Sequence, residues 1–240
     1  SHHCTGPKRS PQDRSDIQVC RTGAETSCCH RPAITHNTSI DERDAVIGII
    51  DYGAGNIRSV GNALERLGEQ FFVSRDVAEL QRAQKLILPG VGEARSAMES
   101  LNHIGLIQWL TTIRVPFLGI CIGMQILFEH SDERDIACLG IVPGRVGRFD
   151  DTKLKVPHMG WNRVNLKAQS ALFEGIRDGE FFYFVHSFSA PLVPDTIGAT
   201  EYGRRFSSAV RHKNFYGVQF HAEKSGNAGL QLLRNFSELC

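Results

Sequence analysis

Long apolar runs and an excess of charge of one sign are both missing from this sequence. The apolar run at residues 46–50 is far shorter than the about 20 residues that a membrane-spanning helix needs. A formal net charge of +1 over 240 residues creates no field that would attract nucleic acid or an anionic membrane. No apolar segment near residue 1 has the form of a secretory signal. We therefore expect no nucleic-acid partner and no membrane partner.

The cysteines lack the regular spacing of a disulfide framework. There are seven of them, an odd number, and four crowd the first 30 residues. The other three, Cys121, Cys138 and Cys240, are scattered. This distribution favours a reducing compartment, and we expect a cytoplasmic protein. No standard zinc spacing occurs either, so we expect no metal and no cofactor.

The composition changes near residue 45. Residues 1–44 are rich in Ser, Thr, Arg, Pro, His and Cys and have no sustained apolar period, which predicts a poorly ordered extension. Apolar runs of strand length begin after them. The chain is 41% hydrophobic, enough for one sizeable core, and we interpret residues 45–240 as a single domain.

Strand-length runs and helical periodicities alternate in the first half of this domain. Strands are expected at 46–50, 70–74, 85–88 and 115–120, and helices at 57–67, 94–101 and 106–112. This order predicts an α/β fold with a doubly wound, mostly parallel sheet and helices on both faces. The second half is richer in strands, which are expected at 154–156, 163–166, 180–188, 197–202, 207–212 and 215–220, before a final helix at Gly226–Leu239.

One cysteine ends a buried strand. Cys121 has a glycine two residues before it and another two residues after it, and a helix is expected over 125–129. A sharp strand-to-helix turn exposes the residue at the turn, and the flanking glycines leave room for the backbone. The helix dipole there favours thiolate over thiol. The alternative is a buried core cysteine, which is the commoner fate of a free thiol.

A histidine and a carboxylate follow the strand at 215–220. If the extended path continues, His221 and Glu223 point to the same side, since strand side chains alternate. The carboxylate would then fix the imidazole tautomer, and the imidazole would face Cys121 as a general base. The alternative is a core histidine beside a surface charge.

Two glycine-rich turns also follow expected strands. In Pro89-Gly90-Val91-Gly92, the glycines let the backbone approach a ligand, so that the N–H of Val91 and that of Ile122 can stabilise an oxyanion. Alone, this segment is a weak indication and could be an ordinary turn. The other turn, at residues 53–55, lacks the third glycine of a dinucleotide site, because Arg58 occupies its position. Nucleotide binding is therefore not expected.

Together these segments resemble the class I glutamine amidotransferases. The matching segments are residues 89–92, 119–125 and 217–225. Residues 51–56, 157–162 and 183–188 are similar, more narrowly, to the glutaminase subunits of imidazole glycerol phosphate synthase, a histidine-pathway enzyme. Two departures stand out. Ala222 replaces the usual proline, which predicts a looser turn, and Ile122 replaces the commoner leucine, which matters little if only its backbone acts.

The resemblance implies hydrolysis of glutamine to glutamate and ammonia. Cys121 would attack the side-chain amide carbon, His221 would transfer protons, and Glu223 would orient His221, with Val91 and Ile122 as the oxyanion hole. The candidate glutamine contacts are Gly90, Gly92, Gln125, Glu133, His186, Ser187 and Phe188. For each of these, an ordinary loop or strand-end role is the alternative.

The resemblance also implies a partner for the ammonia. It would be a cyclase subunit with a (β/α)-barrel fold that makes imidazole glycerol phosphate and an aminoimidazole carboxamide ribotide. The expected contacts with this subunit are Asn56, Met159, Trp161 and Lys224. For Trp161, core packing is the alternative. Three rival functions stay open: a glutaminase for another amidotransferase, a catalytically silent binding module on the same fold, and a partner-independent cysteine hydrolase.

Overall fold

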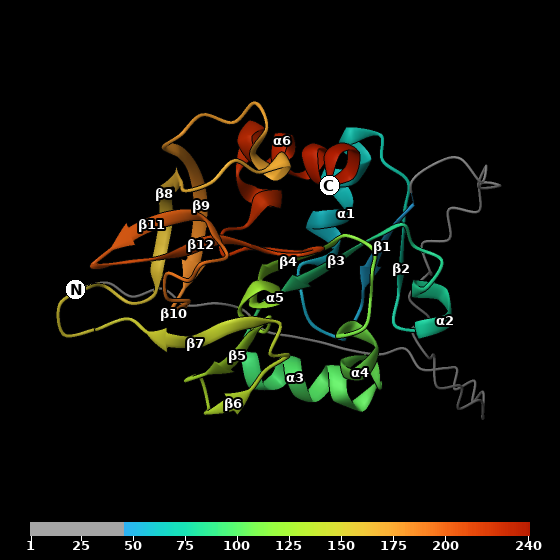
Figure 1. Cartoon of the computed structure of the whole chain (residues 1–240), viewed down its shortest axis with the longest axis horizontal. Coiled ribbons are helices and arrows are strands. Elements are labelled where there is room, and N and C mark those ends of the chain that lie inside the picture. Colours follow the sequence, from blue (N-terminus) through green and yellow to red (C-terminus); the bar gives the residue numbers. More distant parts are fainter. Residues whose placement is uncertain (1–45) are drawn as a thin grey trace, which may run out of the picture. The chain divides into compact units, whose positions relative to one another are not determined.

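The computed structural model describes residues 46–240, so the predicted extension at residues 1–44 lies outside the described part. A nine-stranded sheet dominates (Figure 1). Its strands follow the order β2 (Phe71–Ser74), β1 (Ile47–Ile50), β3 (Lys85–Gly90), β4 (Phe117–Cys121), β13 (Phe215–Val218), β12 (Arg204–His212), β11 (Thr196–Tyr202), β8 (His158–Leu166) and β9 (Glu180–His186).

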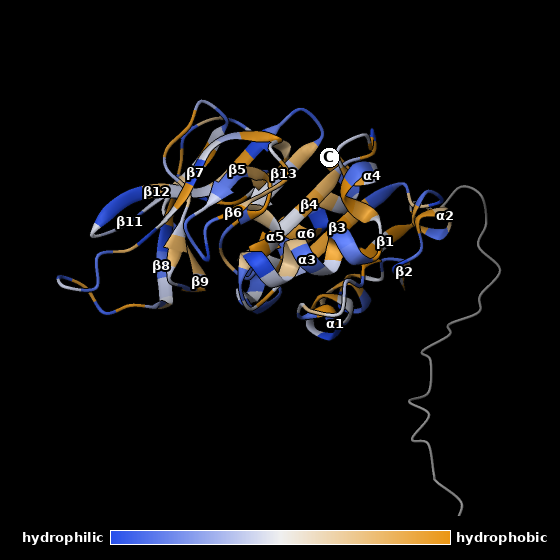
Figure 2. Ribbon diagram, turned by 90° about the horizontal axis from the view of Figure 1, so that it is seen from below, coloured by the Kyte–Doolittle hydropathy of each residue, from blue (hydrophilic) through white to orange (hydrophobic). Residues whose placement is uncertain are grey.

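The half of the sheet from β2 to β13 is parallel. β1, β3, β4 and β13 are buried along their whole length, because helices cover both faces. Helices α1 (Ile57–Leu67) and α6 (Gly226–Leu239) lie on one face, and α3 (Ala94–His103) and α4 (Leu106–Leu110) lie on the other (Figure 1). Figure 2 shows these inner strands as a hydrophobic band. This is the predicted doubly wound α/β architecture.

The remaining strands of the large sheet, β12, β11, β8 and β9, are antiparallel. A second sheet holds β10 (Phe188–Ser189), β7 (Val142–Arg148), β5 (Phe128–Ser131) and β6 (Ile136–Ala137). The β-rich character expected for the C-terminal half is therefore confirmed. Within the described chain, no helix combines the length and the apolar content needed to cross a bilayer.

The helices predicted at 57–67, 94–101, 106–112 and 226–239 are present, with small differences at their ends. Gly68 ends α1 in the left-handed conformation, with φ of 77°, as a helix-ending glycine does. The short helix α2 (Val77–Leu80) was not expected. It begins at Asp76, whose carboxylate accepts hydrogen bonds from the N–H groups of Ala78 and Glu79.

Two local predictions are wrong. The helix expected over 125–129 is instead α5 (Ile122–Gln125), and the chain then enters β5. The helix must begin directly at the turn after Cys121, and it ends early because Phe128 is buried in the second sheet. The strand expected at 154–156 is a turn region, in which Asp150 accepts hydrogen bonds from the backbone and hydroxyl of Thr152.

Candidate active site

Cys121 is the last residue of β4, and α5 begins at the next residue. Its backbone has φ of 56° and ψ of −106°, a conformation that costs a non-glycine residue about 1–3 kcal/mol. The surrounding fold must therefore hold this turn in place. The side chain is 4% exposed, so the sulfur sits in a site that largely excludes water.

Glycines make this turn possible by letting three segments approach each other. A Cβ on Gly123 would lie 2.1 Å from the carbonyl oxygen of Leu88, and one on Gly119 would lie 2.3 Å from the carbonyl oxygen of Gly123. A Cβ on Gly90 would lie 2.5 Å from the nitrogen of Gly123. β3, β4 and the first turn of α5 are thus in backbone contact, and no side chain larger than hydrogen fits between them.

His221 lies between Cys121 and a carboxylate. Its Nδ1 is 2.8 Å from Oε1 of Glu223, and its ring is also hydrogen-bonded to Cys121. Burial lowers the pKa of His221, but these two hydrogen bonds and the charges behind them outweigh it and raise the pKa to about 10. The imidazole is therefore protonated at neutral pH.

The predicted reason for this alignment is wrong, although the two residues do meet. The chain does not stay extended after β13, because residues Ala222–Lys224 form a 3-10 turn, η2. This turn brings the Glu223 carboxylate back onto the ring of His221. The histidine backbone is anchored to β9, since its N–H donates to the Tyr183 carbonyl at 2.9 Å. Ser225 adds a second link: its Oγ donates to the His221 carbonyl and accepts from the Tyr183 N–H.

Glu223 has a second partner that lies far away in sequence. Nδ2 of Asn56 donates to Oε1 of Glu223 at 3.1 Å, while Oε2 is buried without a hydrogen bond. Asn56 precedes α1 directly but its side chain does not cap that helix. The amide is directed to the carboxylate instead. Asn56, expected at a partner interface, is thus also a neighbour of the His221–Glu223 pair.

The two expected oxyanion donors lie on neighbouring strands. Gly90 pairs with Cys121 in the register of β3 and β4, so Val91 and Ile122 follow side by side. Ile122 opens α5, and the first N–H groups of a helix have no partner within it. Val91 itself is 39% exposed.

A tyrosine that sequence reasoning missed lies beside this loop. Tyr52 is 4% exposed, and its hydroxyl makes no hydrogen bond of good geometry. Burial raises the pKa of the Tyr52 phenol, a negative charge on Cys121 raises it further, and the N–H of Val91 weakly opposes both. The hydroxyl therefore lies near both Cys121 and Val91.

Several candidate glutamine contacts are already engaged by the protein. Both ring nitrogens of His186 have partners: Nδ1 donates to the Phe188 carbonyl at 2.7 Å, and Nε2 is 2.9 Å from Nδ1 of His158. Burial lowers the pKa of His186 to about 3, so the ring is neutral. His186 therefore supports Phe188 and offers no free nitrogen to a substrate.

Gln125 and Glu133 are also held in place. Gln125 is 1% exposed, and its Nε2 donates to the Phe188 carbonyl and to Oε1 of Gln219. Oε2 of Glu133 accepts from the N–H of Ala94 at 2.6 Å, at the start of α3, so this carboxylate fixes the helix that follows the oxyanion loop. Burial raises the pKa of Glu133.

The three remaining candidates are Gly92, Ser187 and Phe188. Gly92 is exposed, with φ of 92°. Ser187 and Phe188 follow β9, and the carbonyl of Ser187 accepts from the N–H of Phe149 at 3.0 Å. Gln219, which was not singled out from the sequence, also contacts Cys121: its Nε2 is 3.7 Å from Sγ of Cys121. The sequence offers one signal for Gln219: it is the single amide residue in the otherwise apolar strand expected at 215–220, just before His221.

The expected partner contacts are exposed beside this site. Met159 and Trp161 are 62% and 56% exposed, which excludes core packing for the tryptophan. Trp161 lies edge-on to Tyr183, whose carbonyl holds His221, and Lys224 is also exposed. An exposed tryptophan and methionine next to a catalytic site are typical of an interface.

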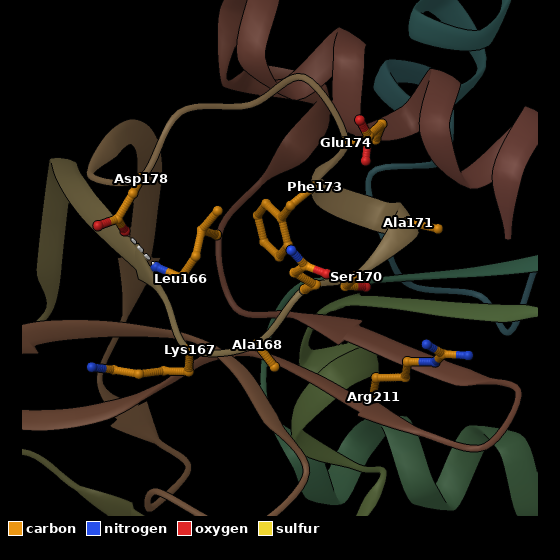
Figure 3. A pocket seen from close by; sticks show the side chains of 10 residues that line it. Leu166, Lys167, Ala168, Ser170, Ala171, Phe173, Glu174, Asp178 and Arg211 are labelled. Carbon is orange, nitrogen blue, oxygen red and sulfur yellow. Dashed lines mark hydrogen bonds between the residues drawn. The ribbon is translucent and has the colours of Figure 1, made fainter.

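A separate hollow is lined by other residues. It has a volume of about 760 Å³ and is lined by residues 166–171 together with Phe173, Glu174, Asp178 and Arg211 (Figure 3). Asp178 is engaged by the backbone N–H of Leu166, and the other charged side chains lie apart around the rim. None of the residues Cys121, His221 and Glu223 lines this hollow. Among residues 46–240, no group of three or more His, Cys, Asp or Glu is arranged to hold a metal.

Comparisons with known proteins agree with this geometry. The family model for glutamine amidotransferase class-I matches residues 48–239. The chain is 47% identical over 192 residues to imidazole glycerol phosphate synthase subunit HisH of Yersinia pseudotuberculosis, covering 80% of this chain and 98% of that protein. It is 50% identical over 197 residues to the subunit HisH of Methanocaldococcus jannaschii, covering 81% of this chain and all (100%) of that protein.

Solved structures share the fold at lower identity. A glutamine amidotransferase aligns with a TM-score of 0.63 at 20% identity, over 80% of this chain and 97% of the other. The PurLQS structure from Thermotoga maritima aligns with a TM-score of 0.61 at 17% identity, over 80% and 97%. The parallel sheet, the strained cysteine turn and these matches lead to one conclusion: the chain belongs to the class I glutamine amidotransferases.

Proposed function

We propose that this chain is the glutaminase subunit of an imidazole glycerol phosphate synthase. It hydrolyses glutamine through a Cys-His-Glu triad and delivers ammonia to a cyclase subunit. The observation that carries the proposal is His221, hydrogen-bonded to Cys121 on one side and to Glu223 at 2.8 Å on the other. The relatives that match nearly their whole length are named as subunits of this synthase, which supports the assignment of the pathway.

The proposed reaction starts with Cys121 beside the protonated imidazole of His221. The thiolate of Cys121 attacks the side-chain amide carbon of glutamine, and a C–S bond forms. His221 then gives its proton to the departing nitrogen, the C–N bond breaks, and ammonia leaves. In the resulting thioester the sulfur carries no charge, and the imidazole is neutral because it has given up its proton. The neutral imidazole can then take a proton from water. That water attacks the thioester, glutamate leaves, and the thiolate returns.

Both steps pass through a tetrahedral oxyanion. The backbone N–H groups of Ile122 and Val91 supply the donors, and one such donor is worth about 3 kcal/mol of barrier. Gly92 keeps the exposed part of the loop free of a side chain where the substrate must approach, and Gly90 lets the loop pack closely on α5. Ser187, Phe188 and Glu133 lie at strand and loop ends around the opening, and they are the proposed contacts for the carboxylate and amino groups of glutamine.

The partner covers this opening. We infer a cyclase subunit with a (β/α)-barrel fold, because ammonia released into water is lost as ammonium. Met159, Trp161 and Lys224 form the proposed contact surface. The side chain of Val91 is exposed beside the oxyanion loop, so a docked partner can press directly on the loop that carries the second donor.

The test is ammonia release from glutamine by the full chain, with and without a cyclase subunit of a related synthase. We expect release that depends on the partner and is abolished in Cys121→Ala. Rescue of a histidine-requiring strain identifies the pathway. Release without any partner would favour the cysteine hydrolase, and absence of release and of Cys121 labelling by a glutamine-like electrophile would favour a silent binding module.

A further inference from the structure

A pair of buried glutamine side chains connects the nucleophile to β9 and the segment after it. Gln219 is fully buried, and its Nε2 is 3.7 Å from Sγ of Cys121. Its Oε1 accepts a hydrogen bond from Nε2 of Gln125 at 3.0 Å, and Gln125 is 1% exposed. The same Nε2 donates to the carbonyl of Phe188 at 2.9 Å. The proposed triad mechanism does not use either amide.

The orientation of both amides follows from one group that cannot change its role. A backbone carbonyl can only accept, so Gln125 must present its nitrogen to the Phe188 carbonyl. The second hydrogen of that nitrogen then meets Gln219, which must present its oxygen. The nitrogen of Gln219 is thereby directed to the sulfur of Cys121. His186 supports the first link, because its Nδ1–H donates to the same carbonyl.

We infer that Gln219 is a catalytic residue that donates a hydrogen bond to the Cys121 thiolate, and that Gln125 is the positioning residue that orients it. The inference rests on the proposed function, and it adds a donor on the sulfur besides His221. When His221 gives its proton to the departing nitrogen, Gln219 keeps a donor on the sulfur. When the thioester breaks, the electron pair of the C–S bond returns to a sulfur that already has this donor.

The two variants that test this inference leave the triad intact. Gln219→Glu has the same size and keeps an oxygen for Gln125, but it presents a carboxylate to the sulfur. Gln219→Met has nearly the same volume and no donor. Gln108→Met is the matched control, because Gln108 is an exposed glutamine on α4.

The readout is the rate at which iodoacetamide alkylates Cys121 as a function of pH, with the site identified by mass spectrometry. A hydrogen bond to a charged group is worth enough that we expect alkylation at pH 7 to slow by about tenfold in Gln219→Met. We expect a larger decrease in Gln219→Glu, and its midpoint moves to higher pH. Gln108→Met keeps the wild-type profile.

A folded Gln219→Met or Gln219→Glu protein with an unchanged alkylation profile overturns the inference, and circular dichroism checks the fold. If Gln219→Met does not fold, the isosteric Gln219→Glu still decides. Alkylation needs neither glutamine turnover nor a partner, so the two failures are distinguishable. If the wild-type protein releases ammonia but the alkylation profile of Cys121 is the same in the Gln219 variants, only this inference is removed. If the alkylation profile changes in the Gln219 variants but the wild-type protein releases no ammonia, only the proposed function is removed.

Discussion

Asn56 and Glu223, 167 positions apart in the sequence, are joined by a hydrogen bond of 3.1 Å between Nδ2 and Oε1. The bond connects the loop after β1 to the carboxylate that orients His221. A carboxylate oxygen shared by an imidazole and an amide has its position defined from two sides. The orientation of the His221 ring therefore depends on a loop that lies beside the proposed partner surface.

Asn56→Asp is expected to lower both activity and stability. It removes the donor to Glu223 and adds a like charge, so we expect kcat for ammonia release to fall about tenfold or more, as for a lost hydrogen bond to a charged group. The thermal midpoint should also fall, because Glu223 is buried and because aspartate caps a helix no better than asparagine does. Asn62→Asp, on the exposed face of α1, is the control for charge and should keep wild-type kcat. A wild-type kcat in Asn56→Asp contradicts the positioning role.

Gly123→Ala is expected to destabilise the protein severely. The added Cβ would lie 2.1 Å from the Leu88 carbonyl oxygen, and neither backbone can yield without opening the contact of β3 with α5. We expect a loss of at least about 3 kcal/mol in the free energy of unfolding, measured in urea. Gly68→Ala is the comparison, because its φ is 77° but it has open space. There the strain alone should cost about 1 kcal/mol.

The buried pair His158 and His186 should make stability depend on pH. Burial lowers the pKa of His158 to about 4 and that of His186 to about 3, from 6.5 in the unfolded chain. The unfolded state thus binds more protons below pH 6.5, and folded-state stability is lost as the pH falls. We expect a decrease of roughly 3–4 kcal/mol between pH 7 and pH 5.

Urea unfolding at both pH values checks this prediction. His158→Phe, which keeps an aromatic ring stacked on Phe184 and Tyr202, should show a smaller decrease. His103→Gln, at an exposed position in the last turn of α3, should show the wild-type decrease. The raised pKa of His221 acts in a different window, since its contribution is lost as the pH rises towards 10. Equal pH dependence in His158→Phe and wild type contradicts the prediction.

Tyr52→Phe is expected to stabilise the fold. The buried hydroxyl makes no hydrogen bond of good geometry, so its removal relieves a desolvation cost, and we expect a gain of about 1 kcal/mol in the free energy of unfolding. Tyr202→Phe is the opposite case, because that hydroxyl donates to the Lys155 carbonyl at 2.6 Å. Thermal unfolding of the two variants should shift in opposite directions. A destabilised Tyr52→Phe protein would show that the hydroxyl is satisfied in solution.

Much of the fold could be predicted because its inner strands are apolar throughout. The run that becomes β1 and the helix closed by Gly68 carry the information locally. The early end of α5 could not be predicted in this way, because it depends on Phe128 being buried in a second sheet whose strands have weak patterns. β7, with two glycines and a proline, was missed for the same reason.

The candidate site shows a similar division. The spacing around Cys121 and the pair His221 and Glu223 indicated the chemistry, although the pair meets through a 3-10 turn rather than an extended chain. The positions of Gln219 and Asn56 depend on contacts across 98 and 167 residues. Such contacts leave no periodicity in the sequence, and only the folded chain reveals them.

The turn at Cys121 has a consequence for redesign. Its geometry is set by main-chain contacts among Gly90, Gly119 and Gly123, not by the side chains that surround the pocket. The side chains that would contact the substrate can therefore be altered while Sγ of Cys121 keeps its position. A scaffold of this kind is suited to accepting a different nucleophile, such as serine at position 121, or a reshaped opening for a larger amide.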